Sequence, residues 1–548
     1  MLGYQPLCSA PLGYVSEVPL GYVPVAMVRF ATRGWTATED DLDPGQHIPG
    51  RLAPMTITRN LSLGGDGLMG GVVRATAGTI ELDNADGALD LLAESRGLQG
   101  RTIRLKFTSD RGGRRKPRVR EMATSWEGVV EDLVWYADKV EIRTRDLLSA
   151  LDRPISTNVY TGQGGRGGMA ALEGKTKPLG FGAVRNARAE LIDNDLLIYQ
   201  FHDGLARAVQ AVRDMGAPLI IRNDVVDYQA LVDAEVELGE VVTCRAEGLF
   251  KLGDFAAGDV TVDFLGHGED PALTIGVWDD GQLWDDGLPW DEGTWPQYSE
   301  TASGIIMALL RRAGIAGSKI EEGQFLDAER AWPHPMHLYV PTGAGTATIL
   351  ELVGQIAEAA GLLVSVNRSG RVYARRLTTG VGGTVISEED IMEISRIEPP
   401  YGRPIYHAAI PYGANETVQS SNELVKPDDE IVSEATLKAY QTAYVGVADA
   451  GSSRTLGQVQ TARSVTPEYA VYTTAAGAQA RAWDIVRTHS PGRSTYRVTC
   501  KRKGWRLDLG DPVPLTHPRF GLASGKQTIV VGIQDNGPAR EVTLDLLG

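Results

Sequence analysis

Residues 102–107 read Thr-Ile-Arg-Leu-Lys-Phe, with an apolar side chain at every second position. Residues 139–143, Lys-Val-Glu-Ile-Arg, show the same alternation. Because successive side chains of a strand point to opposite faces of a sheet, a period of two predicts strands buried on one face. Residues 79–82 also alternate and run into Asp-Asn-Ala-Asp-Gly at 83–87, a cluster typical of turns. The pattern from about residue 25 to 151 is therefore β.

Helical spacing of apolar residues is rarer and lies later in the chain. It predicts helices at Leu205-Ala208-Val209-Val212, at 305–310 with Ser303 as N-cap and Gly314 as stop, at 349–357 between a Thr348/Glu351 capping box and Gly361, and at 478–486. Residues 362–366 and 371–374 flank a turn at 367–370 and predict a hairpin, and strands are expected at 505–509, 528–531 and 542–546. The expected fold class is α+β, rich in β-structure and multidomain.

Composition sets broad limits. A chain of 548 residues suggests three to four domains at about 150 residues each, and 43% hydrophobic residues suffice for buried cores. A net charge of −16 argues against a general nucleic-acid binder, which needs a basic surface. Cys8, Cys244 and Cys500 lie too far apart in sequence to suggest a disulfide framework or a zinc motif. No membrane span is expected, because no apolar run reaches about 18 residues. No secretory signal is expected either, because the N-terminus lacks the basic-then-apolar order of one.

The acidity is concentrated in one segment. Residues 1–150 carry a net charge of −1, residues 151–298 one of −14, and residues 299–548 one of −1. Such an asymmetry marks a distinct domain or surface. Together with the β and helical patterns it suggests five units, with boundaries at 1–24, 25–151, 152–298, 299–395 and 396–548.

The first unit contains an internal repeat. Leu-Gly-Tyr occurs at 2–4, 12–14 and 20–22, and four prolines lie between residues 6 and 24. Proline excludes a helix here and disfavours a central strand. The expected structure is an extended arm with Tyr and Leu anchors, and its functional counterpart is an arm that docks on a neighbouring subunit.

Two candidate binding motifs are interpreted as loops. Residues 162–167 match G-x-G-x-x-G, but a dinucleotide site needs a preceding strand and a long following helix, and Gly174 and Pro178 interrupt any helix after 169–172. A basic run lies between two predicted strands and consists of Arg111, Arg114, Arg115, Lys116, Arg118 and Arg120. A solvated hairpin loop is the simplest interpretation. A contact with an acidic neighbour or with passing nucleic acid is the alternative, although no aromatic residues interleave for single-strand binding.

Two further motifs bear on metal or sugar binding. Trp-Asp-Asp/Glu-Gly occurs at 278–281, 284–287 and 290–293, followed by Trp295. Its carboxylates suit Ca²⁺, yet the spacing lacks the pattern of an EF-hand, so turns with indole anchors are favoured. His334 and His337 form H-x-x-H, but the prolines around them prevent the helix that would align both imidazoles. No catalytic, metal or cofactor-binding residue is assigned, and no enzyme activity is expected.

An ordered set of stretches carries a family resemblance. It comprises the N-terminal Pro-Leu-Gly-Tyr repeats, residues 78–87, 126–130, 145–155, 174–182, Asn186, 196–204 and 509–518. The most specific part is Gly-Lys-Thr-Lys-Pro-Leu-Gly-Phe-Gly at 174–182, followed by Asn186 and residues 196–204. Together these stretches resemble the central tail-hub, or baseplate hub, family of long-tailed bacteriophages and gene transfer agents. Residues 396–490 match nothing in that pattern.

The resemblance implies a homotrimer in the virion, at the tail tip or baseplate, assembled in the cytoplasm of the bacterial host. Each chain would supply two tail-tube-like β domains, at 25–151 and 396–548, to a pseudo-sixfold ring, with 152–298 and 299–395 decorating or closing it. The implied partners are a distal tail protein, a tape-measure protein and tip or fibre proteins. Double-stranded DNA would pass without sequence recognition, because acidic walls repel phosphate.

Two functions from different classes follow. The first is the structural hub of a phage tail. The second is a tail-associated carbohydrate-binding or glycan-hydrolysing protein, suggested by the tryptophan repeat, since indole faces stack on sugars. Because the acidic segment 151–298 lies outside both proposed ring domains, an acidic collar beside the ring is expected rather than an acidic bore.

Overall fold

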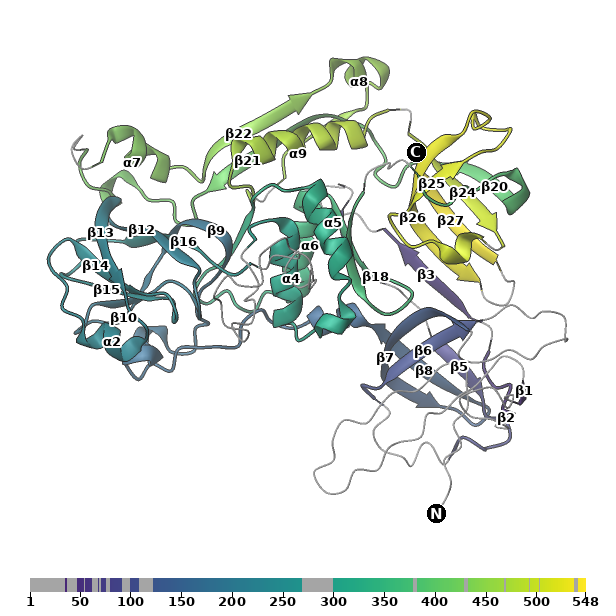
Figure 1. The fold of residues 1–548 in the computed structure, drawn as a ribbon, viewed down its shortest axis with the longest axis horizontal. Coiled ribbons are helices and arrows are strands. Elements are labelled where there is room, and N and C mark those ends of the chain that lie inside the picture. The colour runs from purple at the N-terminus through teal and green to yellow at the C-terminus, as the bar shows by residue number, and fades with distance from the viewer. Residues whose placement is uncertain are drawn as a thin grey trace, which may run out of the picture.

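The structure is a computed structural model. It describes residues 35–36, 47–53, 55–61, 68, 70–74, 79–90, 99–107, 122–268, 299–377, 382–427, 432–467, 470–491, 493–501, 503–536 and 541–548. Three features of the sequence lie outside these ranges: the arm 1–24, the basic run 111–120 and the tryptophan repeat at 278–295. The described chain is β-rich and multidomain, with helices gathered mainly near its centre (Figure 1).

The alternating residues form a four-stranded antiparallel sheet at the lower right of Figure 1. Its order is β5-β8-β7-β6, with β5 Thr79–Asp83, β6 Thr102–Phe107, β7 Ala123–Trp135 and β8 Lys139–Asp146. Val140 and Ile142 of β8 are buried between more exposed polar residues, so the period-two prediction is confirmed. Strands β1 (Trp35–Thr36) and β2 (His47–Ile48) pair before this sheet in the chain, and the turn η2 (Leu147–Leu151) follows it.

A nine-stranded sheet forms the left-hand lobe of Figure 1. Its order is β10-β11-β15-β14-β13-β12-β16-β9-β17, and only the β13–β14 pair is parallel. The strands are β9 Leu179–Arg188, β10 Glu190–Asp193, β11 Ile198–Gln200, β12 Ala208–Asp214, β13 Ala217–Asp224, β14 Glu240–Cys244, β15 Leu249–Leu252, β16 Val260–Leu265 and β17 His337–Val340. The short helix α2 (Tyr228–Asp233) and the turns η3 (Gly165–Gly167) and η4 (Ala170–Leu172) belong to this lobe.

The predicted helix at Leu205–Val212 spacing is wrong, because Ala208 to Asp214 form strand β12. This strand is hydrogen-bonded to β16 on one side and to β13 on the other. The hairpin with β13 turns at Met215 and Gly216, both with positive φ. Pairing on both edges satisfies the backbone that a helix would have satisfied locally.

The other predicted helices are confirmed, and two of them lie at the centre of the molecule together with one helix that was not predicted (Figure 1). They are α4 Ala302–Arg312, α5 Glu322–Ala331, which the sequence did not predict, and α6 Ile349–Ala360. The capping box of Thr348 and Glu351 is present, and Gly361 ends α6 in the left-handed conformation. The N-cap of α4 is Thr301 rather than the expected Ser303, and its hydroxyl accepts from the N–H of Gly304.

The predicted hairpin after α6 is also confirmed, as β18 (Leu362–Val366) and β19 (Val372–Arg376). Strand β4 (Gly71–Val73) adds to it in parallel, giving the order β19-β18-β4. The turn η5 (Gly317–Lys319) precedes α5. The largest hydrophobic core joins these helices and strands.

A second hairpin runs along the top of Figure 1. It consists of β21 (Ile405–Ala414) and β22 (Tyr444–Gly451), with β23 (Arg463–Val465) parallel to β21. The helices of this region are α7 Glu434–Tyr440, α8 Ser453–Gln458 and α9 Ala475–Thr488, and η7 (Ser421–Glu423) is a short turn. Helix α9, which was predicted from 478 to 486, covers one face of the hairpin.

The chain ends in a six-stranded sheet at the upper right of Figure 1. Its strands are β20 Ile391–Ile397, β24 Thr495–Cys500, β25 Pro512–Leu515, β26 Lys526–Asn536, β27 Glu541–Leu547 and β3 Thr56–Asn60, with the turns η6 Glu388–Asp390 and η8 Lys503–Arg506. Two of the three predicted C-terminal strands are confirmed. The third, at 505–509, is wrong, since η8 and a loop occupy these residues.

Strands from one proposed unit pair with the sheets of another. Strand β3, from the range 25–151, pairs with β26 in the C-terminal sheet, and β4 pairs with β18 in the range 299–395. Strand β17 of the range 299–395 pairs with β9 of the nine-stranded sheet. The sheets are therefore tied together by backbone hydrogen bonds as well as by side chains.

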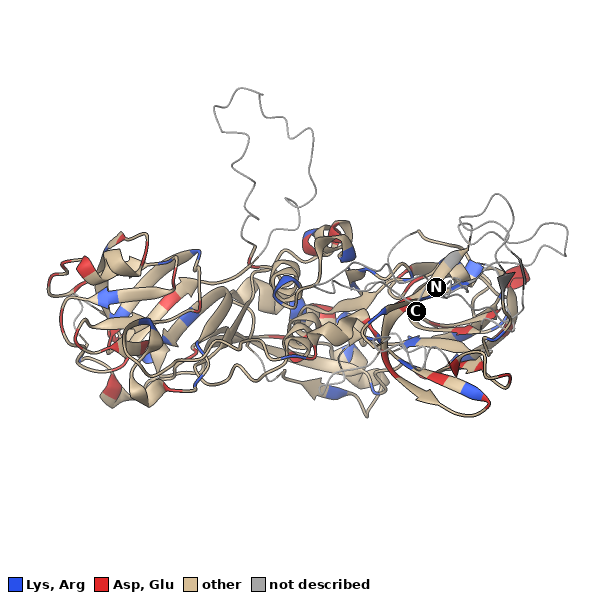
Figure 2. Ribbon diagram, turned by 90° about the horizontal axis from the view of Figure 1, so that it is seen from below, with Lys and Arg blue, Asp and Glu red and all other residues tan. Residues whose placement is uncertain are grey.

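The acidic residues of segment 151–298 lie partly inside and partly outside the described ranges. Residues 151–268 carry 17 acidic and 11 basic residues, and Figure 2 shows both signs on the nine-stranded lobe. The remaining eight acidic residues of the segment, with no basic residue among them, lie at 269–298, outside the described ranges. The acidic collar stays a prediction.

Candidate functional site

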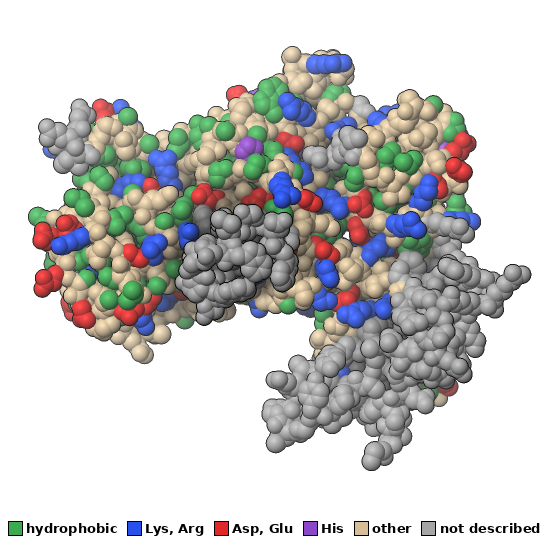
Figure 3. Space-filling view, in the orientation of Figure 1, with side chains coloured by type: hydrophobic (Ala, Val, Ile, Leu, Met, Phe, Trp, Pro, Cys, Tyr) green, Lys and Arg blue, Asp and Glu red, His purple; other side chains and the backbone are tan. Residues whose placement is uncertain are grey.

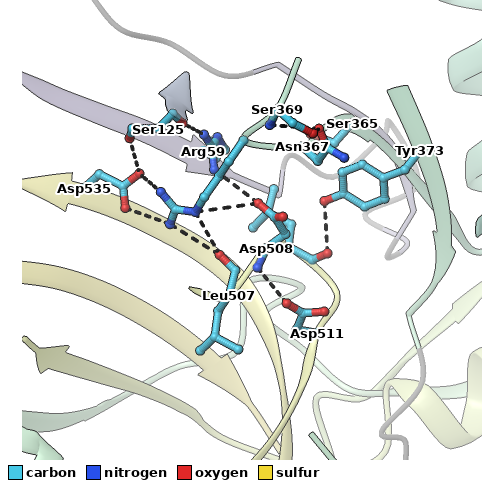
Figure 4. A network of polar contacts seen from close by, with 12 residues as sticks. Arg59, Ser125, Ser365, Asn367, Ser369, Tyr373, Leu507, Asp508, Asp511 and Asp535 are labelled. Atoms are coloured by element: carbon cyan, nitrogen blue, oxygen red, sulfur yellow. Dashed lines mark hydrogen bonds and ion pairs between the residues drawn. The ribbon is translucent and has the colours of Figure 1, made fainter. Parts of the chain in front are cut away.

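Three buried charged side chains and one partly exposed carboxylate, that of Asp508, meet where the four-stranded sheet, the β18–β19 hairpin and the C-terminal sheet come together (Figure 4). Arg59 comes from β3, Arg368 from the turn of the hairpin, Asp535 from β26 and Asp508 from the loop after η8. We call these four residues the charged junction. Charged groups are rarely this buried unless they are paired, so the arrangement requires a structural explanation.

Arg368 is the centre of the charged junction. Its guanidinium binds Asp535 with both terminal nitrogens, and the bond from Nη2 to Oδ1 is 3.0 Å long. Nε and Nη2 also donate to the carbonyl oxygen of Leu507, each at 3.3 Å. Arg368 and Asp535 are 8% and 2% exposed. Two-point binding fixes the orientation as well as the distance, so the hairpin turn is locked onto strand β26.

Arg59 connects a third element. Its guanidinium donates to the backbone carbonyl of Ser125 in β7 and lies 3.5 Å from the carboxylate of Asp508. The Ser125 hydroxyl in turn donates to Asp535 Oδ2 at 3.2 Å. Burial and the nearby Arg368 lower the pKa of Arg59 from its usual value, while both carboxylates counteract this change.

Asp508 is held by the backbone of its own loop. Its N–H donates to Asp511 Oδ2 at 2.7 Å, and the Tyr373 hydroxyl donates to the carbonyl oxygen of the adjacent Leu509 at 3.0 Å. Burial raises the pKa of Asp508, and the Arg59 and Arg368 charges partly offset that effect. The two arginines and two aspartates balance in charge, which is the condition under which burying them is tolerable.

The sequence did not indicate this site. The partners are 66 to 449 residues apart, and each charge sits in a strand or turn where a solvated side chain is the normal expectation. Two of the stretches that carry the family resemblance nevertheless meet here, since 126–130 lies in β7 next to Ser125 and 509–518 begins beside Asp508. What the site does chemically is to join three sheets rigidly.

A second joint involves Asn186, one of the residues that carry the family resemblance. It is fully buried with φ 51°, a left-handed conformation that Asn adopts more readily than most residues. Its side-chain amide donates to the Thr417 carbonyl at 2.7 Å, and its backbone N–H donates to Asp263 Oδ1 at 2.7 Å. Arg213 holds the same Asp263 carboxylate. Asn186 thus attaches the β21–β22 connection to the nine-stranded sheet.

The H-x-x-H histidines are not brought together as ligands. His337 begins β17 and pairs through Nε2 with Glu416 Oε1 at 2.9 Å, whereas His334 packs edge-on against Trp332 at 4.6 Å between ring centroids. No group of three or more His, Cys, Asp or Glu side chains within the described ranges is placed to hold a metal ion. Gly162 to Gly167 form a tight loop that contains the 3₁₀ turn η3.

Two other histidines, the fully buried His202 and the partly exposed His267, pack against each other beside strand β9. The rings of His202 and His267 are 4.5 Å apart, and Gly180 N–H donates to His202 Nδ1 at 3.1 Å. Burial and the charge of Arg312 lower the pKa of His267 to about 4, and burial, His267 and Arg312 lower that of His202 well below its usual value. Both imidazoles are therefore neutral in the folded protein near pH 7.

We expect acidification to destabilise the fold through this pair. In the unfolded chain both histidines titrate near pH 6.5, so between pH 6.5 and 4 the unfolded state binds more protons and the free energy of unfolding falls as the pH falls. The shift at His267 corresponds to roughly 3 kcal/mol. Urea unfolding at pH 7.5, 5.5 and 4.5 measures this, and His267→Gln should flatten the pH dependence. An unchanged dependence in His267→Gln would contradict the assignment.

The remaining features from the sequence are the tryptophan repeat, the basic run and the cysteines. The tryptophan repeat and the basic run lie wholly outside the described residues, so the carbohydrate alternative stays a prediction. Cys244 and Cys500 are buried and unpaired, and burial raises the pKa of each to about 11. No helix in the described part of the chain is both long and apolar enough to cross a membrane.

Comparison with protein-family models and with curated proteins gave no match. Solved structures similar to this chain include the 43 kDa tail protein of a Shewanella oneidensis prophage, at 11% identity over 92% of this chain and 94% of that one, with a TM-score of 0.34. A chain of the virion of a native gene transfer agent is 14% identical over 73% and 91%, with a TM-score of 0.42. A tail protein of Neisseria meningitidis is 7% identical over 92% and 94%, with a TM-score of 0.35.

Proposed function

We propose that the chain is a structural protein of a phage-type tail, the hub that joins a sixfold tube to a threefold tip. The observation that carries the proposal is the ordered set of hub-like stretches from 78–87 to 509–518. The most specific of them, 174–182, runs into β9, the strand next to the edge of the nine-stranded sheet. Non-enzymatic function is part of the proposal.

The arrangement of the two proposed tail-tube-like ranges supports it. The four-stranded sheet and the C-terminal sheet lie next to each other at one end of the molecule, and β3 connects them by joining the second sheet (Figure 1). Two β bodies that occupy consecutive places in one ring must be neighbours and must not rotate against each other. The charged junction between these sheets supplies that rigidity.

In the proposed particle, three copies form a pseudo-sixfold ring through which double-stranded DNA passes. The neighbours would be a distal tail protein, a tape-measure protein and a tip or fibre protein. The location would be the tail tip or baseplate of the virion, after assembly in the host cytoplasm. The acidic excess of the chain lies at 151–298, outside both proposed ring ranges, so it would repel DNA beside the channel rather than from the channel wall.

Stoichiometry tests the proposal. Native mass spectrometry of the purified chain and quantitative protein analysis of isolated tail tips should both give three copies. Cryo-electron microscopy of the tip should show the two sheets alternating around a threefold axis. A stable monomer that is absent from tail particles would overturn the proposal.

A further inference from the structure

Strand β22 is an edge of its sheet, and no strand in the described ranges pairs with its outer side. Natural edge strands are usually protected by charged side chains, proline, bulges or a covering element. Among the eight residues of β22 the only charged one is Asp449, and none is proline. The Asp449 carbonyl on this edge accepts from Gln479 Nε2 of α9 at 2.7 Å, and no strand in the described ranges covers the edge, so it can receive another strand.

The exposed face of the same strand is apolar. Ala448 and Ala450 are buried on the side covered by α9, whereas Val445 and Val447 on the opposite side are 48% and 46% exposed. Pro411 of β21 lies beside Val447 but is buried, so it adds nothing to the exposed face. Figure 3 shows hydrophobic side chains along the upper edge of the molecule, over this hairpin. An unpaired edge next to an uncovered apolar face is the surface that β-strand addition uses.

The N-terminal arm contains a segment of matching length and character. Residues 12–18, Leu-Gly-Tyr-Val-Ser-Glu-Val, are its longest proline-free stretch and have one residue fewer than β22. Glu17 is the only Asp, Glu, Lys or Arg among the first 24 residues, so the arm brings apolar side chains to an apolar face. Pro11 and Pro19 bracket the stretch. They would end the pairing at both ends and discourage further strands from adding to the new edge.

We propose that residues 12–18 of a second copy of the chain add as a strand to β22. A second copy is assigned because β1, the first described strand after the arm, lies at the lower right of the molecule and β22 lies along its top (Figure 1). The proposal rests on the oligomer of the proposed function and deepens it by naming one subunit contact. In this arrangement the arm's Leu, Tyr and Val side chains pack on Val445 and Val447, and its backbone pairs with the edge.

Peptide binding tests the contact without requiring a ring. A fluorescent peptide of residues 11–19 is titrated into the chain lacking residues 1–24, and anisotropy gives the dissociation constant. We expect saturable binding that weakens several-fold with Val447→Lys, because the ammonium would replace an apolar cross-strand neighbour of the arm's Leu, Tyr and Val side chains. Ile220→Lys, at a 67% exposed apolar position on β13, is the matched control and should leave binding unchanged. A peptide with Val15→Pro should bind weakly, since it loses a backbone donor.

Sedimentation velocity of the full chain identifies the copy that supplies the arm. Deletion of residues 1–24 and Val447→Lys should lower self-association to the same extent. The contact is wrong if the peptide does not bind or if Val447→Lys leaves its binding unchanged. The assignment to a second copy is wrong if the arm protects β22 from hydrogen exchange in a monomer. If the chain is a trimer and both the deletion and Val447→Lys leave it intact, the proposed contact is wrong but the hub proposal stands. If the protein is absent from tail particles, the hub proposal itself is wrong.

Discussion

Replacing Arg368 with alanine is expected to lower the free energy of unfolding by about 3–5 kcal/mol, because it leaves the Asp535 carboxylate buried without its partner. Asp535 is 2% exposed, and the Ser125 hydroxyl alone would remain bonded to it. The carbonyl of Leu507 would lose its donor as well. Urea unfolding followed by tryptophan fluorescence measures the change, and hydrogen exchange should show increased opening of β7 and β26 together.

The matched control lies in the same C-terminal sheet. Arg497 binds Asp545 through two hydrogen bonds of 2.8 and 2.9 Å, but the arginine side chain is 52% exposed. Arg497→Ala should therefore cost less than about 1 kcal/mol. Equal losses in the two variants would show that burial does not distinguish them. If Arg368→Ala fails to fold, Arg368→Lys, which keeps the charge and loses the two-point geometry, gives the smaller loss that the same explanation requires.

Gly182→Ala is expected to have an effect of similar size. Gly182 has φ +67° in the middle of β9, and a Cβ atom there would overlap the backbone carbonyl oxygen of Met336. Because that oxygen belongs to the residue before β17, no side-chain rotation relieves the overlap. The β9–β17 pairing would have to open, and we expect a loss of at least about 3 kcal/mol, within the upper range for single substitutions.

Gly174→Ala separates the cost of the left-handed backbone from the cost of the steric overlap. Gly174 has φ +77°, yet no atom lies within 4 Å of the position its Cβ would take. The free energy of unfolding of Gly174→Ala should therefore fall only by the cost of the left-handed backbone, about 1–2 kcal/mol. Thermal unfolding of both variants gives the comparison. A loss at Gly182 no greater than at Gly174 would mean that β9 and β17 can separate without cost.

Where local chemistry decides the structure, the sequence was sufficient. The capping box of Thr348 and Glu351, the left-handed stop at Gly361 and the turn at 367–370 all act within a few residues, and each was predicted. The period-two strands were predicted for the same reason. The overall fold class followed from these elements.

Where distant partners decide, the sequence was misleading or silent. Residues 505–509 alternate like a strand, but Arg368 and Tyr373 occupy the carbonyls of Leu507 and Leu509, and a turn results. Residues 205–212 have helical spacing, but strands on both sides impose the extended form. The charged junction was invisible because nothing near Arg59 or Asp535 in the sequence marks either one as buried.

The place of β3 in the C-terminal sheet has a consequence for synthesis. Arg59 leaves the ribosome long before Asp508, 449 residues later, and Ser125 precedes Asp535 by 410. At about 5–20 residues per second, the early segment waits for tens of seconds before its partners exist. During that interval β3 is an unpaired strand, and the C-terminal sheet completes only when the last strands emerge. Translation thus delays the final assembly of each subunit until its chain is nearly finished, and a truncated chain cannot form this joint.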